Sequence, residues 1–299
     1  QAAQLLTVIN RIATATGATV SVLTEGANTV GAHWLGAVAK NGSLNAQQMF
    51  AAPRDAYVLL NVEPQFEASN PAQAMKALSS GFVLAMNAYF SAVSDYADVI
   101  LPVTPFTETA GTFVNAEGRA QAFHPVVKPL GQARPAWKVL RVLGERLGLS
   151  NDAVFRANDI KDVRAVSDAA IADGMAMNNN AVTADVAVSQ TNSGLERSAR
   201  TAPYSVDAIT RHAASLQQTE WAKEAAVVGL ANNVYANLGL AQDLAGDAAW
   251  VYVSQDGLKI KAQAVLRSEL GDNVVDIQQG STLAAQLGNQ FGTVTVERA

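Results

Sequence analysis

Four short apolar runs dominate the first hundred residues, and stretches with helical periodicity separate them. The runs are ATVSVL, AYVLLNV, FVLAMN and DVILP, at residues 18–23, 56–62, 82–87 and 98–102. Strands that are almost continuously apolar are typical of a parallel sheet covered on both faces. The alternation of such strands with helices therefore predicts a doubly wound, mainly parallel α/β fold for residues 1–150.

The intervening segments carry helix signals of their own. Residues 4–15 place large aliphatic side chains along one helical face. Asn70 followed by Pro71 predicts a capping residue and a first helical position, and so a helix over residues 72–79. A further helix is predicted over residues 133–147.

After residue 150 the pattern changes. Residues 151–245 are predicted to be a helical or irregular connecting region, with helices over 205–216 and 219–229. Residues 246–299 alternate with period two between turn signals, which predicts a small β-domain at the carboxyl end. The sequence thus divides into an α/β domain (1–150), a connecting region and a β-domain.

Composition excludes several function classes. The chain has no cysteine, so these residues form no disulfide, cysteine-ligated zinc site or ordinary iron–sulfur site. Its three histidines are too scattered to make a metal site by themselves. A net charge of −5 offers no footprint for nucleic acid. No apolar run approaches the roughly 18 residues of a membrane span.

The low fraction of charged residues and the first residues of the sequence each lead to an expectation. Only 16% of the residues are charged, against about 25% in an average soluble protein. This favours a surface that is partly hidden against partner proteins. The sequence opens at Gln1 without an initiating methionine or a signal pattern, so we expect it to belong to a longer polypeptide.

The densest group of unusual polar residues follows the fourth apolar run, at the carboxyl end of a predicted strand, where open α/β sheets bind ligands. Glycines there permit close backbone approach, Thr and Asn form hydrogen bonds, and Arg suits phosphate. The candidates for contact with a nucleotide-like ligand are Glu108, Gly111, Thr112, Asn115, Gly118 and Arg119. A second interpretation stays open, in which the loop folds on itself and Glu108, Glu117 and Arg119 pair internally.

These residues also carry a family resemblance. ADVILP, a following Glu and GTFVNAEGR resemble the molybdopterin oxidoreductase superfamily, which includes formate dehydrogenases, nitrate reductases and the large iron–sulfur subunit of respiratory complex I. The motif here looks most like that large subunit of the NADH-quinone oxidoreductase. PYSVDAITRHAASLQQT, at residues 203–219, favours complex I over an enzyme with a working molybdenum centre. Arg211 and His212 within it are expected to be solvated or to face a partner.

The resemblance to complex I implies a non-catalytic scaffold in an NADH:quinone oxidoreductase. This region would pack against other peripheral-arm subunits on the cytoplasmic side of the bacterial inner membrane, without a membrane span of its own. Iron–sulfur clusters are expected on cysteines upstream of Gln1. The loop from Glu108 to Arg119 would be a vestige of a pterin-dinucleotide site, with molybdopterin absent and no catalytic residue.

The superfamily also implies an alternative. The chain would then be the pterin-dinucleotide-binding part of a molybdenum or tungsten oxidoreductase such as a formate dehydrogenase. In that case the six candidate residues would contact the cofactor.

Overall fold

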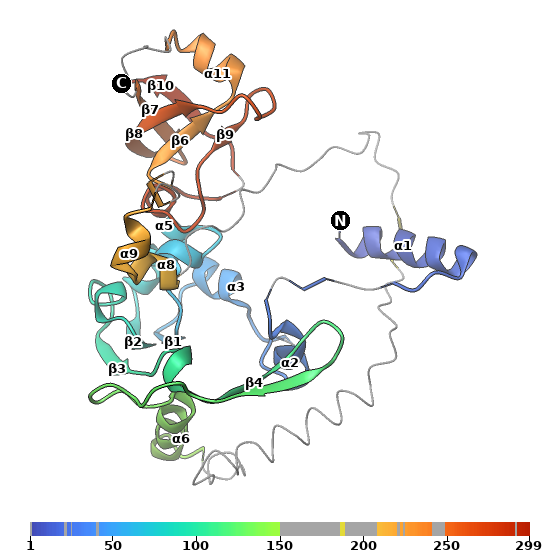
Figure 1. Cartoon of the computed structure of the whole chain (residues 1–299), viewed down its shortest axis with the longest axis vertical. Helices are drawn as coiled ribbons and strands as arrows, with labels where there is room; N and C mark the ends of the chain where they lie inside the picture. Colours follow the sequence, from blue (N-terminus) through green and yellow to red (C-terminus); the bar gives the residue numbers. More distant parts are fainter. Residues whose placement is uncertain are drawn as a thin grey trace. The chain divides into compact units, whose positions relative to one another are not determined.

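Figure 1 shows the computed structural model of the chain, which comprises two compact units. One unit comprises Gln1–Asn45 and Val103–Glu196, and the other comprises Ala46–Pro102 and Arg197–Ala299. The division into three regions expected from the sequence stays a prediction. The structure describes residues 2–20, 23–24, 26–39, 42–149, 186–188, 208–219, 222–223, 225–240, 249–290 and 292–299.

A three-stranded parallel sheet lies in the second unit, in the order β1-β2-β3. Its strands are β1 (Ala56–Leu60), β2 (Phe82–Asn87) and β3 (Val99–Pro102). Tyr57 is paired with Val83 across the first ladder. Three of the four strands predicted from apolar runs are therefore confirmed, together with the parallel α/β class.

The remaining strand prediction, for residues 18–23, is wrong where the structure describes these residues. Residues 18–20 and 23 form no strand. Leu23 is 91% exposed, and a strand is stable only when a neighbour pairs with it and buries its apolar side chains. The local apolar run is present here, but the pairing partner is not among the described residues.

Helix α5 (Pro71–Leu78) connects β1 to β2 and begins as the sequence predicted. The Oδ1 atom of Asn70 accepts a hydrogen bond from Gln73 N at 2.9 Å, and Pro71 fills the first turn. The buried face of α5 packs on one face of the sheet, where five residues form a core cluster. These are Tyr57, Leu59, Ala77, Leu78 and Val83.

Short helices surround this sheet. The helix α4 (Pro64–Glu67) follows β1, and the 3-10 helix η1 (Phe90–Ala92) follows β2, so both lie at the carboxyl ends of parallel strands. The described part of the predicted helix over 205–216 forms two short helices, separated by an extended Ala213. Other helices described in the second unit are α3 (Ala46–Ala51), α8 (Ala208–His212), α9 (Ala214–Gln217), α11 (Asn232–Asn237) and η4 (Ala284–Gln286).

A second sheet, curled and drawn in orange to red in Figure 1, confirms the expected small β structure at the carboxyl end. Its strand order is β10-β7-β8-β6-β9, with β6 parallel to β8 and the other pairs antiparallel. Alternate residues of β7, such as Val251 and Val253, are fully buried. The strands are β6 (Val227–Leu230), β7 (Ala249–Gln255), β8 (Leu258–Leu266), β9 (Val275–Asp276) and β10 (Thr295–Arg298).

Strand β6 corrects the helix predicted over residues 219–229. Val227 and Val228 are β-branched and favour a strand. Val227 pairs with Gln263 of β8, and Leu230 pairs with Val275 of β9. These distant pairings override the local helical pattern. Most of the predicted connecting region, including residues 151–185, lies outside the described residues.

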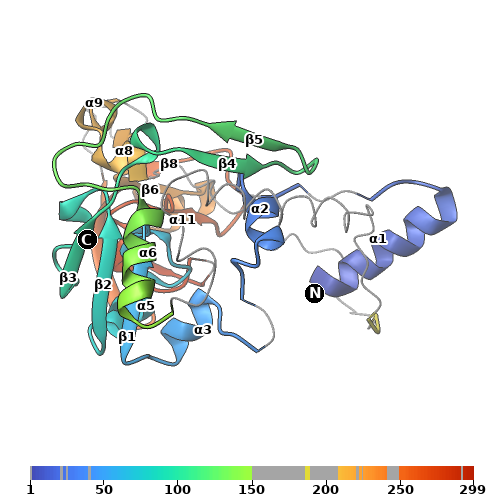
Figure 2. The same ribbon diagram turned by 90° about the horizontal axis from the view of Figure 1, so that it is seen from below.

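The first unit contains α1 (Ala2–Thr16), which confirms the helix predicted over residues 4–15. Its other feature is an antiparallel hairpin of β4 (Gly111–Val114) and β5 (Ala120–Phe123). Figure 2 shows α2 (Thr29–Trp34) beside β4. The two are joined by Asn28, whose Oδ1 accepts a hydrogen bond from Val114 N at 2.8 Å.

Two further helices belong to the first unit. The 3-10 helix η2 (Phe106–Glu108) precedes the hairpin, and α6 (Ala136–Arg146) follows it, in agreement with the helix predicted over 133–147. Across the described parts of both units, no helix has the length and apolar character needed to span a membrane.

Candidate functional site

The first of the six candidate residues, Glu108, fixes the chain that returns from the hairpin. Its Oε2 atom accepts a hydrogen bond from Leu130 N at 3.0 Å. Val126 N donates to Thr107 O at 2.8 Å alongside it. The Glu108 carboxylate is therefore used to hold residues 126–130 against η2, rather than in an ion pair with Arg119.

Asn115 and Gly118 form the turn between β4 and β5. The Oδ1 atom of Asn115 accepts hydrogen bonds from Glu117 N at 3.0 Å and from Arg119 N at 2.9 Å. Gly118 has a φ of 80°, a left-handed conformation that favours glycine. Turn geometry therefore accounts for both residue types.

Gly111 makes room for an aromatic ring. It pairs with Phe123 across the hairpin, and a Cβ atom at Gly111 would overlap the Phe123 ring. The same ring meets Phe113 edge-to-face, with 5.1 Å between ring centres. Packing within the hairpin therefore requires glycine at this position.

The local structure does not explain Thr112 and Arg119 as it explains the other four candidates, because their side chains form no hydrogen bond with the described residues of the hairpin. Thr112 is half-buried and pairs with Ala122, on the face of the hairpin opposite to Phe113 and Phe123. Arg119 is exposed and makes no ion pair with a described residue. Its guanidinium is the charged donor that the hairpin presents outward.

A second group of polar residues lies in the second unit, around the buried carboxylate of Glu63. Arg211 of α8 approaches Glu63 Oε2 at 3.1 Å and Glu67 Oε1 at 2.8 Å. His212 Nε2 lies 2.9 Å from Glu63 Oε1. The side chains of Arg211 and Glu63 are only 7% and 1% exposed. The expectation that Arg211 and His212 are solvated or face a partner is therefore wrong, because their partners lie within this chain.

Aromatic rings complete this buried group. The His212 ring stacks on Tyr89, with 4.1 Å between the ring centres and 17° between the planes. The Arg211 guanidinium carbon lies 4.6 Å from the centre of the Phe66 ring. We call Glu63, Phe66, Glu67 and Tyr89, with Arg211 and His212, the buried ion cluster. Sequence reasoning missed Glu63, because nothing near it in the chain marks it as buried.

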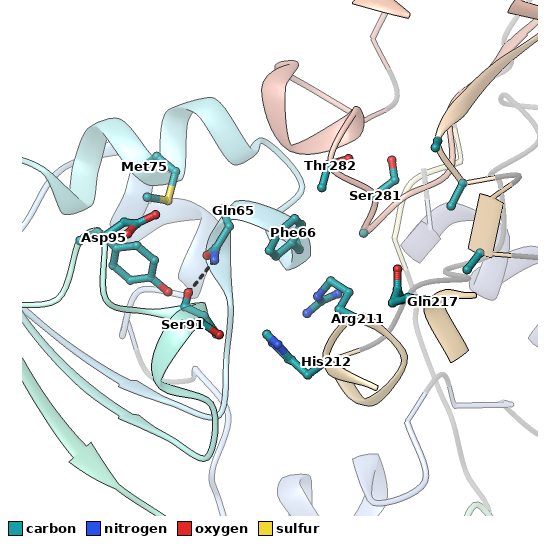
Figure 3. Close-up of a pocket in the computed structure, with 16 residues that line it drawn as sticks. Gln65, Phe66, Met75, Ser91, Asp95, Arg211, His212, Gln217, Ser281 and Thr282 are labelled. Atoms are coloured by element: carbon teal, nitrogen blue, oxygen red, sulfur yellow. Dashed lines mark hydrogen bonds between the residues drawn. The ribbon is translucent and has the colours of Figure 1, made fainter. Parts of the chain in front are cut away.

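A pocket of about 470 Å³ adjoins the buried ion cluster. Figure 3 shows Arg211 and His212 extending from α8 toward Phe66 and Gln65 of α4. Because α4 follows β1 and η1 follows β2, the pocket lies at the carboxyl ends of two parallel strands. Open α/β sheets place their ligands at this position.

Part of this chain matches a known protein family. The model of the molybdopterin oxidoreductase family matches residues 1–146. This part of the chain is therefore similar to the molybdopterin oxidoreductases. The match includes the parallel sheet, the hairpin and helix α6, and it ends before the curled sheet.

The sequence relatives of this chain include putative formate dehydrogenases from Staphylococcus aureus. The protein of strain USA300 is 37% identical over 67 residues, which is 22% of this chain and 7% of the relative. The protein of the bovine strain RF122 is 36% identical over 67 residues. The chain therefore spans only a small part of these relatives.

Among solved structures, the acetylene hydratase from Pelobacter acetylenicus has a similar fold. The TM-score is 0.53 at 14% sequence identity, and the match covers 86% of this chain and 47% of that chain. This likeness concerns the fold and extends beyond residues 1–146.

The molybdopterin oxidoreductase family implies a pterin dinucleotide, which the residues present fit in one respect. Gly111, Asn115 and Gly118 shape the hairpin, and Glu108 holds the segment that returns from it. Arg119, by contrast, presents an exposed guanidinium suited to a phosphate. Contact of all six residues with a cofactor stays a prediction. Among the described residues, no three His, Asp or Glu side chains are grouped so that they would hold a metal ion.

Tyr96 lines the pocket, and its surroundings shift the pKa of its phenol. Burial raises the pKa of the Tyr96 phenol above its ordinary value, and the negative charges of Glu63 and Glu67 raise it further. Tyr96 therefore remains a neutral hydroxyl at pH values where an exposed tyrosine ionises.

This pKa shift predicts a loss of stability at alkaline pH. Above about pH 10 the unfolded chain releases the Tyr96 proton and the folded chain keeps it, so stability falls as pH rises. The slope approaches about 1.4 kcal/mol per pH unit for one proton. We expect Tyr96→Phe to show a shallower decline than the wild type in urea unfolding above pH 10. Equal slopes for the two proteins would contradict the prediction.

Proposed function

We propose that this chain is the pterin-dinucleotide-binding part of a molybdenum or tungsten oxidoreductase that resembles formate dehydrogenases. The observation that carries the proposal is the family match of residues 1–146, supported by 37% identity to the staphylococcal proteins over 67 residues. The activity and substrate of the whole protein are part of this proposal.

In this proposal the chain's own residues bind and orient the cofactor. Arg119 pairs with a phosphate of the dinucleotide. Asn115 and Glu108 keep the hairpin and its return segment rigid, so that Arg119 is held in place. When bound, the cofactor supplies the two-electron redox chemistry.

Cofactor content of the full-length protein tests the proposal. We expect molybdenum or tungsten by elemental analysis and a fluorescent pterin after oxidative release. Arg119→Ala should weaken retention of the dinucleotide about ten- to a hundredfold, since a hydrogen bond to a charged group contributes roughly 1.5–3 kcal/mol. Lys128→Ala, also exposed on the return segment, should retain wild-type content. A wild-type protein without metal and pterin would refute the proposal.

A second candidate is the scaffold role in an NADH:quinone oxidoreductase. The specific observation in its favour is that Arg211 and His212, within the stretch that resembles the complex I subunit, serve a buried structural contact. This candidate expects NADH-dependent quinone reduction by the intact complex without pterin, molybdenum or tungsten. Formate-dependent dye reduction by a pterin-loaded protein would instead favour the first proposal.

A further inference from the structure

We propose that the crevice at the carboxyl ends of β1 and β2 is a guanidinium-binding site, and that Arg211 occupies it as an intramolecular ligand. The proposal does not depend on the enzymatic activity of the whole protein. It assigns a planar cation to a position where open α/β sheets more often hold an anionic ligand.

The geometry around Arg211 matches a guanidinium group. The Nε and Nη2 atoms both lie 3.1 Å from Glu63 Oε2, and Nη2 lies 2.8 Å from Glu67 Oε1. Two carboxylates therefore receive one rigid fork of donors. The Phe66 ring, 4.6 Å from the guanidinium carbon, adds a cation–π contact.

Each carboxylate has a contact that does not involve Arg211, since His212 Nε2 lies 2.9 Å from Glu63 Oε1. Glu67 Oε2 accepts a hydrogen bond from Glu63 N at 3.0 Å, so the short helix α4 fixes one acid against the backbone of the other. Glu63 is 1% exposed, and a buried carboxylate without a cation is costly. The crevice therefore requires a positive group and disfavours the phosphates of a nucleotide.

The adjoining pocket gives a small ligand access to this position. It measures about 470 Å³ and is lined by both Phe66 and Arg211. Removing the Arg211 side chain would enlarge it by the volume of an alkylguanidinium. The class of ligand that the site takes is therefore a small alkylguanidinium, or an arginine side chain from another segment.

Chemical rescue of the full chain tests the proposal. Arg211→Ala should lower the Tm by about 5–10 °C, in keeping with loss of a buried ion pair. Methylguanidinium at low millimolar concentration should restore a large part of this loss in Arg211→Ala. It should not shift the Tm of the wild type, in which Arg211 fills the site. Methylammonium at equal concentration should have little effect, because it carries the positive charge but lacks the planar guanidinium group.

Two matched variants separate this site from general effects. Arg146→Ala removes an exposed arginine in α6 and should show neither the loss nor the rescue. The double variant Glu63→Gln/Arg211→Ala lacks the buried carboxylate and should lose the response to methylguanidinium. If Arg211→Ala does not fold, Arg211→Gln takes its place in the same titration.

Three results would overturn the proposal. The first is an unchanged Tm of the Arg211 variant with methylguanidinium. The second is an equal rise in the wild type, in Arg146→Ala or with methylammonium. The third is stabilisation of the Arg211 variant by GDP, which would assign the crevice to an anionic nucleotide. Because each readout is a Tm, these results are independent of the metal and pterin content that tests the proposed function.

Discussion

Glu63→Gln is expected to lower the free energy of unfolding by about 3–5 kcal/mol, the usual loss when one partner of a buried ion pair is removed. Glutamine has nearly the same shape as glutamate, so packing is retained. The substitution removes the negative charge that faces the Arg211 guanidinium at 3.1 Å. It also removes the negative charge beside His212 Nε2, which lies 2.9 Å from Glu63 Oε1. Urea unfolding measures the effect as a lower midpoint at an unchanged slope.

Glu117→Gln is the matched control, because Glu117 is exposed in the hairpin turn. Its midpoint should lie within experimental error of the wild type. If Glu63→Gln and Glu117→Gln unfolded at the same urea concentration, the buried ion cluster would not stabilise the fold.

Leu230→Ala is expected to cost about 2–5 kcal/mol, because it opens a cavity in a packed core. Leu230 is 0% exposed and lies in β6, between β8 and β9 of the curled sheet. Its side chain belongs to the same core cluster as Val251 and Val253. Loss of near-ultraviolet circular dichroism during urea unfolding measures the change.

The control for Leu230 is Leu216→Ala in α9, where the leucine is 41% exposed. This change removes the same atoms from a site where little apolar area is buried, and it should cost less than about 1 kcal/mol. Equal losses at the two positions would contradict the assignment of Leu230 to a closed core.

The parallel strands could be predicted because their information is local. FVLAMN is almost wholly buried as β2, and its apolar run coincides with the observed strand from Phe82 to Asn87. Asn70 and Pro71 likewise mark the start of α5, because capping depends on neighbours within one turn. Such features need no knowledge of the rest of the chain.

Features decided by distant partners could not be predicted in this way. Strand β6 forms because Val227 pairs with Gln263. The local sequence around Val227 has a helical pattern and does not indicate this distant partner. Arg211 follows the same rule, since Glu63 lies 148 positions earlier. A charged residue is usually solvated, so the sequence favours exposure until the partner is known.

The residue types of the candidate loop, from Glu108 to Arg119, could not be assigned to one role from the sequence. Gly, Asn and Glu at sheet edges serve both ligands and turns, and the sequence does not separate the two uses. The structure assigns Gly111, Asn115 and Gly118 to hairpin packing and turn geometry. Arg119 is the candidate whose exposed charge these contacts leave unexplained.

The position of β6 between β8 and β9 has a consequence for synthesis on the ribosome. β6 emerges first, yet its neighbours at residues 258–266 and 275–276 follow roughly thirty and forty-five positions later. During that interval an apolar strand has both edges unpaired, the condition under which nascent chains associate with one another. Slow translation between residues 231 and 276 should therefore lower the yield of folded protein, and chaperone binding should concentrate on this window.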